Sequence, residues 1–469
     1  MDKRRRFSLS GYTLFLFFSS LCLSSCTSVL DQHYYALKSN PEEARQYLDR
    51  QLLFNPFFTD AHLERGHLHF NAGRFREAIA DFETVKSAKA DCLKCVVSME
   101  IVIGSAYKNL GETKKARQQF ERVRELAPDE AKGAAGLGLV SLAEGNASAA
   151  IEAFSEAIRL DPKESSYYGN RGLAYVIAKD LQRGLEDYNR ALDMDPRYFQ
   201  CYANRGSLLL DEGQVVEAEK DFSRAIELEP TSAACWNSRG YARHLQERFD
   251  EALADYNQAL KLDPQLTRAL GNRAQLYLQT GRLQEAAKEY AIVTALVPQD
   301  PLPHFNYGSV LFILGEADSS IVELNRAEEF GIRSPSLYLN RGVALRSVGR
   351  TEEAMTDLDR ALQLLPEWPE ALDERGTTYL ALCKPEKAVV DFRKAVSLAP
   401  ERTALHYFLA MSLEYAGRTE EATSAYESYA MMLIPPGEMS YVNDARESAA
   451  RLRNRGAEKV SPCGCTSTP

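Results

Sequence analysis

Proline recurs along this chain at a fixed interval, which restricts the folds the chain can adopt. Intervals of 34 or 68 residues separate eight prolines: Pro128, Pro162, Pro196, Pro230, Pro264, Pro298, Pro366 and Pro400. In this register most copies have Gly at the eighth position, Ala at the twentieth and an aromatic residue at the twenty-fourth. A fixed period of this length is typical of stacked repeats, which need no single large core.

Each copy of the pattern predicts two helices that pack antiparallel. Small residues at the eighth and twentieth positions let the helices approach closely, and the aromatic residue fills the space beside them. Proline ends the unit because it cannot continue the second helix. One pair can bury its apolar face only against neighbouring pairs, so we expect an all-α solenoid.

The pattern resembles the tetratricopeptide repeat (TPR). The resemblance implies a right-handed superhelix of antiparallel helix pairs whose first helices line a concave surface. Eleven copies can be aligned, one at 59–92 and ten in succession at 97–436, with an insertion at 93–96 between them. TPR proteins bind other proteins, so the resemblance implies protein or extended peptide partners.

Segments at both ends fit the pattern less well. Ala44, Leu48 and Pro56 match the twentieth, twenty-fourth and thirty-second positions, which predicts a linker and a degenerate N-terminal cap repeat over 26–58. At the other end we expect a capping helix at 437–455 and a flexible tail at 456–469.

The first 25 residues are expected to be an export signal. Four basic residues at 3–6 precede an apolar run that is short for a transmembrane helix. The run ends in Leu-Ser-Ser-Cys, which resembles the lipobox of bacterial lipoproteins. By that resemblance Cys26 carries the lipid (palmitate among its acyl chains), and Thr27 implies the outer membrane facing the periplasm. A plain secretory signal or an uncleaved anchor is the alternative.

Arginine replaces the expected large apolar residue at the seventh position of seven copies. In those copies the twenty-third residue is always acidic, whereas in the other four only Glu323 is. We infer a partly buried ion pair between the two helices of each copy. A row of arginines that reads an anionic ligand is the alternative. The pairs are Arg65 with Asp81, Arg171 with Asp187, Arg205 with Asp221, Arg239 with Asp255, Arg273 with Glu289, Arg341 with Asp357, and Arg375 with Asp391.

Asparagine recurs at the sixth position, on the helix that the resemblance places at the concave surface. A similar ladder in the TPR superhelix of O-linked N-acetylglucosamine transferases grips the backbone of extended polypeptides. A side-chain amide can both donate to and accept from a peptide group. Polar filler in a duplicated repeat is the other interpretation. The ladder comprises Asn170, Asn204, Asn272, Asn306 and Asn340, with Asn237 beside the interrupting Ser238.

Other motifs give little support to catalysis or to metal binding. Cys92 and Cys95 form a CxxC pair, for which oxidation to a local disulfide is the default in an exported protein. His62, His67 and His69 do not have the spacing of a zinc-binding HExxH helix. We find no phosphate-binding loop, nucleophile elbow or second domain, so we expect no enzymatic activity, cofactor, metal or small-molecule substrate.

The sequence thus predicts a non-enzymatic scaffold anchored to a membrane by its N-terminal lipid, assisting assembly or secretion at the cell envelope. The net charge of −10 argues against nucleic acid as a partner. Two alternatives stay open. One is a cell-wall adaptor that holds enzymes by its outer faces, and the other is an exported redox or metal-binding protein that uses the CxxC pair.

Overall fold

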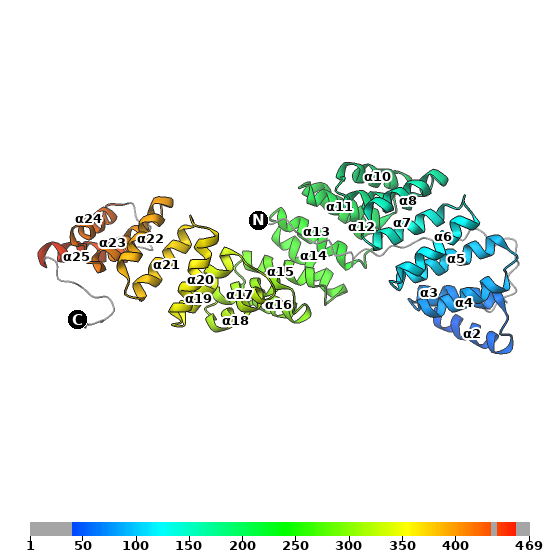
Figure 1. Ribbon diagram of the computed structural model, residues 1–469, viewed down its shortest axis with the longest axis horizontal. Helices are drawn as coiled ribbons and strands as arrows, with labels where there is room; N and C mark the ends of the chain where they lie inside the picture. Colours follow the sequence, from blue (N-terminus) through cyan, green and yellow to red (C-terminus); the bar gives the residue numbers. More distant parts are fainter. Residues whose placement is uncertain (1–39, 433–438, 456–469) are drawn as a thin grey trace. The chain divides into compact units, whose positions relative to one another are not determined.

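The structure is a computed structural model that describes residues 40–432 and 439–455 (Figure 1). Across these two ranges the chain forms helices and no strand. The helices are α2 (Pro41–Phe54), α3 (Thr59–Asn71), α4 (Phe75–Ala88), α5 (Leu93–Asn109), α6 (Thr113–Leu126), α7 (Ala131–Ala143), α8 (Ala147–Leu160), α9 (Ser165–Ile177), α10 (Leu181–Met194), α11 (Phe199–Asp211), α12 (Val215–Leu228), α13 (Ala233–Leu245), α14 (Phe249–Leu262), α15 (Thr267–Gln279), α16 (Leu283–Leu296), α17 (Pro301–Ile313), α18 (Ala317–Glu329), α19 (Pro335–Ser347), α20 (Thr351–Leu364), α21 (Pro369–Ala381), α22 (Pro385–Leu398), α23 (Thr403–Tyr415), α24 (Thr419–Ala430) and α25 (Met439–Arg455).

These helices follow the period of the sequence, which confirms the all-α solenoid. Odd-numbered helices from α3 to α23 are the first helices of the eleven copies, and even-numbered helices from α4 to α24 are the second helices. The insertion at 93–96 is the first turn of α5. The signal at 1–25, the lipidation site Cys26 and the tail at 456–469 lie outside the described residues.

Glycine and the aromatic residue meet where the two helices of a copy cross. In α9 a Cβ atom on Gly172 would lie 3.0 Å from the ring of Tyr188 on α10. Tyr188 is almost fully buried, as are the aromatic residues at the same position in other copies. Any larger side chain at the glycine would therefore push the ring out of the core.

The turn between the two helices needs a left-handed residue. Gly145 has a φ of 75° there, a conformation that glycine adopts without steric cost. Lys179 holds the equivalent place in the next copy with a φ of 68°. The turn geometry is thus kept even where the sequence lacks glycine.

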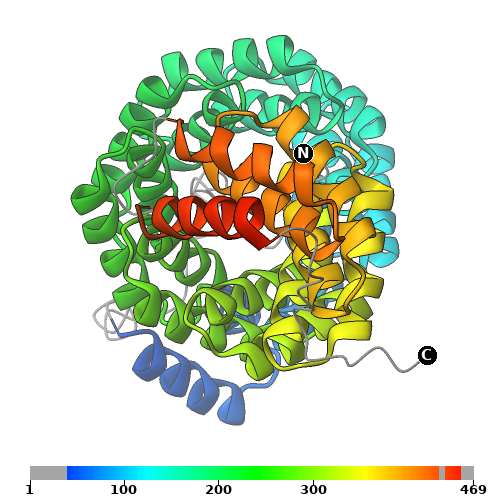
Figure 2. The ribbon, with the colours of Figure 1, turned by 90° about the vertical axis from the view of Figure 1, so that its left-hand side faces the viewer.

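Helices at both ends close the array. On α2 the buried Ala44 and Leu48 pack with Ala61 of α3, as a second helix of a repeat would. On α25, which is red in Figure 2, the buried Val442 and Ala445 join the core cluster of the last copy. Each end helix buries apolar side chains of the terminal repeat that would otherwise face water.

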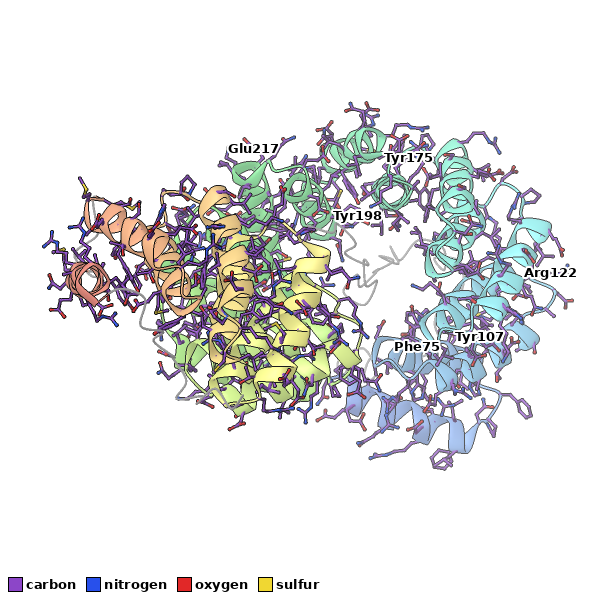
Figure 3. The ribbon with its side chains drawn as sticks, turned by 60° about the vertical axis from the view of Figure 1, so that its left-hand side comes forward. Phe75, Tyr107, Arg122, Tyr175, Tyr198 and Glu217 are labelled. Carbon is purple, nitrogen blue, oxygen red and sulfur yellow. A yellow bond between two sulfur atoms is a disulfide. The ribbon has the colours of Figure 1, made fainter. Side chains whose placement is uncertain are left out.

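The chain divides into two compact units between Asp255 and Tyr256, inside α14. In unit 1 the helix pairs form a curve, with Tyr198 on its inner side and Arg122 and Glu217 on its outer side (Figure 3). The last two belong to the second helices α6 and α12. No helix of the described ranges is long and apolar enough to span a membrane.

Candidate functional site

The structure brings together the seven arginines and the seven acids that vary together in the sequence. Arg171 Nε donates to Asp187 Oδ2 at 2.7 Å and its Nη2 donates to Oδ1 at 2.8 Å, a bidentate pair between α9 and α10. The hydrogen bond to Asp187 raises the pKa of Arg171. The same contacts join Arg65 to Asp81, Arg205 to Asp221, Arg239 to Asp255, Arg341 to Asp357 and Arg375 to Asp391.

Each arginine also reaches a third helix, which sequence reasoning missed. Arg205 Nη1 donates to Asn189 Oδ1 of the preceding copy at 2.6 Å, and Arg239 Nη1 donates to Ser223 Oγ at 3.4 Å. The acceptor always stands sixteen residues before the arginine, at the twenty-fifth position of the preceding copy. The acceptors are Asp49, Ser155, Asn189, Ser223, Asn257, Asn325 and Asp359.

A signal for this third contact is present in the sequence. Every copy that precedes an arginine copy has Asp, Asn or Ser at the twenty-fifth position. Four copies precede a copy without the arginine, and their twenty-fifth residues are Glu83, Glu121, Ala291 and Arg393. The arginine therefore ties its own copy internally and also ties it to the copy before. This is a structural role, and it leaves no row of free arginines for an anionic ligand.

One of the seven pairs is incomplete. Arg273 Nη2 donates to Glu289 Oε1 at 2.5 Å, but Arg273 Nε and Glu289 Oε2 are buried without a hydrogen-bond partner. Glu289 is the single glutamate among the seven acids. Its side chain is one methylene group longer than that of aspartate, and here only Oε1 accepts from the guanidinium.

Replacing Glu289 by Asp should stabilise the copy at 267–300. The shorter acid would accept from both Nε and Nη2 of Arg273, and satisfying two buried polar atoms is expected to raise the free energy of unfolding by about 1 kcal/mol. Hydrogen exchange of α15 and α16 amides would measure it. Asp255→Glu, the reverse change, is the matched control and should lower the stability of its own copy. A less stable E289D variant would contradict this account.

In the copy at 301–334, which lacks the arginine, a histidine contacts the acidic residue instead. His304 Nδ1 lies 2.6 Å from Glu323 Oε2, and His304 Nε2 lies 3.1 Å from the Pro298 carbonyl oxygen. Both partners are acceptors, so the imidazolium form, with two donors, satisfies both contacts. This explains why Glu323 is acidic in a copy without arginine. His62 makes the same two contacts, with Asp81 and the Pro56 carbonyl.

The asparagine ladder lies on the first helices, with unequal exposure. Asn170 and Asn237 are buried, whereas the other four are half-buried. Asn340 Nδ2 donates to Ser309 Oγ at 3.1 Å. Among the described residues the side-chain amides of Asn170, Asn204 and Asn306 make no hydrogen bond. Tyr198, on the inner side of unit 1, packs against Gly169 next to Asn170 (Figure 3).

A carboxyl group that sequence reasoning missed lies on the first helix α21. Burial, together with repulsion from the neighbouring Glu374, raises the pKa of Asp373 to about 6. Arg402 Nη2 lies 3.5 Å from Asp373 Oδ2 and partly opposes this shift.

Cys92 and Cys95 form a disulfide at the start of α5. The Cys92 sulfur also accepts a hydrogen bond from the Cys95 backbone N–H. Over residues 40–432 and 439–455 no group of three or more His, Cys, Asp or Glu side chains is placed to hold a metal ion.

Several solved structures are similar to this chain in fold. A human IFIT1 chain, from the dimer with m7Gppp-AAAA, is 18% identical with a TM-score of 0.47, over 78% of this chain and 88% of that one. A chain of the Cut9–Hcn1 hetero-tetramer of APC/C is 14% identical with a TM-score of 0.43, over 81% of this chain and 88% of that one. YrrB, a TPR protein with an unusual peptide-binding site, is 22% identical with a TM-score of 0.37, over 39% of this chain and 95% of that one. No curated protein matches the sequence significantly.

Family models recognise the repeats themselves. One tetratricopeptide repeat model matches residues 101–165, 142–199, 203–267, 246–301 and 272–336. A second model of the same description matches 59–92, 335–367 and 369–402. Together these matches cover well over half of the chain, and they confirm the resemblance that the period of 34 predicts. The chain belongs to the tetratricopeptide repeat family.

Proposed function

We propose that this protein is a non-enzymatic scaffold that binds protein or extended peptide partners along its first helices, anchored to a membrane at the cell envelope. TPR arrays are protein-interaction scaffolds, and tetratricopeptide repeat models match most of this chain. We propose further that Cys26 carries a lipid, and that the protein assists assembly or secretion on the periplasmic side of the outer membrane.

The unpaired amides of Asn204 and Asn306 are the observation that carries peptide binding. Both side chains are half-buried on first helices, and neither amide is satisfied by a described residue. A polar group that is partly desolvated gains most from a partner that completes its hydrogen bonds. An extended peptide offers one N–H and one C=O per residue, which matches the two ends of each amide.

Replacing Asn204 and Asn306 by Ala should weaken partner binding without unfolding the protein. Neither amide holds the fold through a hydrogen bond, so the free energy of unfolding should change by less than about 1 kcal/mol. Crosslinking in intact cells, followed by comparison of the adducts, would measure partner binding. We expect the N204A/N306A variant to lose adducts that the unchanged protein forms.

Val390→Ser on α22 is the control for the outer-face alternative. Val390 is 66% exposed on a second helix, so its replacement should leave a partner bound at the first helices in place. If V390S loses the adducts while N204A/N306A keeps them, the cell-wall adaptor is the better account. If only replacement of Cys92 and Cys95 abolishes function, the redox or metal-binding protein is the better account.

Exposed apolar residues near the N-terminus support the membrane anchor. Leu53 and Phe54 at the end of α2 and Phe57 in the following turn are 81%, 89% and 86% exposed. Exposed apolar clusters mark contacts with proteins or membranes. Since Asn40 follows Cys26 by only fourteen residues, an acylated Cys26 would keep α2 within about 50 Å of the bilayer.

Cys26→Ser should release the protein from the membrane fraction and abolish incorporation of labelled palmitate. The acyl chains supply the membrane affinity, since the body of the protein is acidic. Cys22→Ser, also in the leader, is the matched control and should stay at the membrane. Wild-type protein that takes up no label would refute lipidation.

A further inference from the structure

A pocket of about 250 Å³ opens in unit 1 at the copy 131–164. Side chains from helices α6, α7 and α8 line it. The lining residues are Arg117, Arg124, Ala134, Leu137, Ser141, Ala149, Glu152, Ala153 and Glu156. We refer to it as the α7 slot.

Five of the residues that line the slot stand at repeat positions that larger side chains fill in other copies. These are the fourth, seventh, eleventh, nineteenth and twenty-third positions of the copy. The copy at 131–164 alone among the eleven has small or aliphatic residues at all five. They are Ala134, Leu137, Ser141, Ala149 and Ala153.

The next copy shows how the same space is filled. There the five positions hold Tyr168, Arg171, Tyr175, Arg183 and Asp187. The Arg171 guanidinium lies 5.7 Å from the Tyr168 ring centroid and 5.8 Å from that of Tyr175. The Arg183 guanidinium also lies over the Tyr175 ring, 4.7 Å from its centroid. Two tyrosine rings held against guanidinium groups are therefore what the α7 slot lacks.

The slot is also lined by a guanidinium and a carboxylate that could contact such a ring. Arg124 on α6 and Glu152 on α8 both line the slot, and neither forms an ion pair with another described residue. Arg117 is paired with Glu144 at 2.6 Å, and Glu156 with Arg159 at 3.4 Å. A free guanidinium can lie over an aromatic ring. A free carboxylate can accept a hydrogen bond from a phenol.

We propose that the α7 slot binds a tyrosine side chain of a protein partner. The ring would rest on the methyl groups of Ala134 and Ala153, under Arg124, with its hydroxyl donating to Glu152. The inference rests on the proposed function only in that the partner is a protein. The slot is separate from the asparagine ladder, so each can fail without the other.

Fluorine NMR on the purified full-length chain tests the proposal, with 3-fluoro-N-acetyl-tyrosinamide as the probe. We expect saturable line broadening with a dissociation constant on the order of 1 mM, as suits a ligand of this size. Unlabelled N-acetyl-tyrosinamide should reverse the broadening, and N-acetyl-alaninamide should not. The N204A/N306A variant should bind the probe as the unchanged protein does, which separates this test from that of the asparagine ladder.

Two variants decide where the probe binds. A134Y/S141Y fills the slot with the residues of the next copy and should weaken binding by about tenfold or more. Arg124→Gln changes an exposed side chain and should weaken binding about threefold through the lost contact with the ring. If A134Y/S141Y does not fold, R124Q and E152Q decide the matter. Absence of broadening at about 10 mM probe, some ten times the expected dissociation constant, would overturn the proposal. So would equal broadening by every variant.

Discussion

Arg341→Leu should lower the free energy of unfolding of the copy at 335–368 by about 3–5 kcal/mol. Arg341 and Asp357 are 6% and 3% exposed, which makes this arginine the most buried of the seven. Without Arg341, the Asp357 carboxyl group would lose its bidentate partner in a site that water hardly reaches. Arg360, 3.6 Å from Asp357, is half exposed and can offset only part of this loss. Hydrogen exchange of α19 and α20 amides would report the local stability, which a whole-chain transition of a repeat array can hide.

The double variant R341L/D357A is the matched control, because the chain already contains that combination. Leu137 and Ala153 hold the same two positions in the copy at 131–164. Removing both charges avoids an unpaired buried carboxylate, so the double variant should recover most of the stability that R341L loses. A single variant within about 1 kcal/mol of the unchanged protein, or a double variant worse than the single, would contradict the role assigned to the pair.

Gly136→Ala should destabilise the boundary between the copies at 97–130 and 131–164 by about 2 kcal/mol. A Cβ atom on Gly136 would lie 2.2 Å from Phe120 Cδ1. Phe120 is 1% exposed, and its ring already rests on Gly104, where a Cβ atom would lie 3.0 Å away, so the ring has no room to move. Overpacking of about 3 kcal/mol would outweigh the gain of about 1 kcal/mol from alanine in a helix.

Gly271→Ala tests the same substitution without the clash. A Cβ atom on Gly271 of α15 meets nothing within 4 Å, so alanine should stabilise that copy by about 1 kcal/mol. Phe120→Leu, which copies Leu358 at the equivalent position, should make G136A tolerable when the two are combined. Hydrogen exchange of α6, α7 and α15 amides would rank the unchanged protein, G136A, G271A and the F120L/G136A double variant by local stability. Equal effects of G136A and G271A would show that Phe120 does not limit this site.

Most of the fold could be predicted because the period of 34 is carried by residues with local roles. Gly172, Tyr188 and Pro196 each act within one helix pair, so their spacing in the sequence is enough to place them. The start of α5 at Leu93 could not be placed in this way. An insertion of four residues is compatible either with a longer loop or with one more helical turn.

The candidate site was predictable where its partners lie in one copy and was missed where they do not. Arg171 and Asp187 vary together within a copy, which is enough to pair them. The contact of Arg171 with Ser155 crosses to the preceding copy, and the sequence signal for it is weaker because Asp, Asn and Ser are all accepted. Burial was also missed. Asn170 shares the ladder position with Asn204, and Asn237 stands one residue before it, but the packing around Asn170 and Asn237 hides them from a partner.

The arginine ties also bear on how the array would respond to mechanical load. Arg171, Arg205 and Arg239 link successive copies of unit 1, so a pulling force on these copies is shared by neighbouring copies. The copies that begin at 97, 131, 301 and 403 have no such tie to the copy before them, because their seventh residue is not arginine. We expect a pulling force to be shared less at those four junctions than at the junctions that an arginine ties.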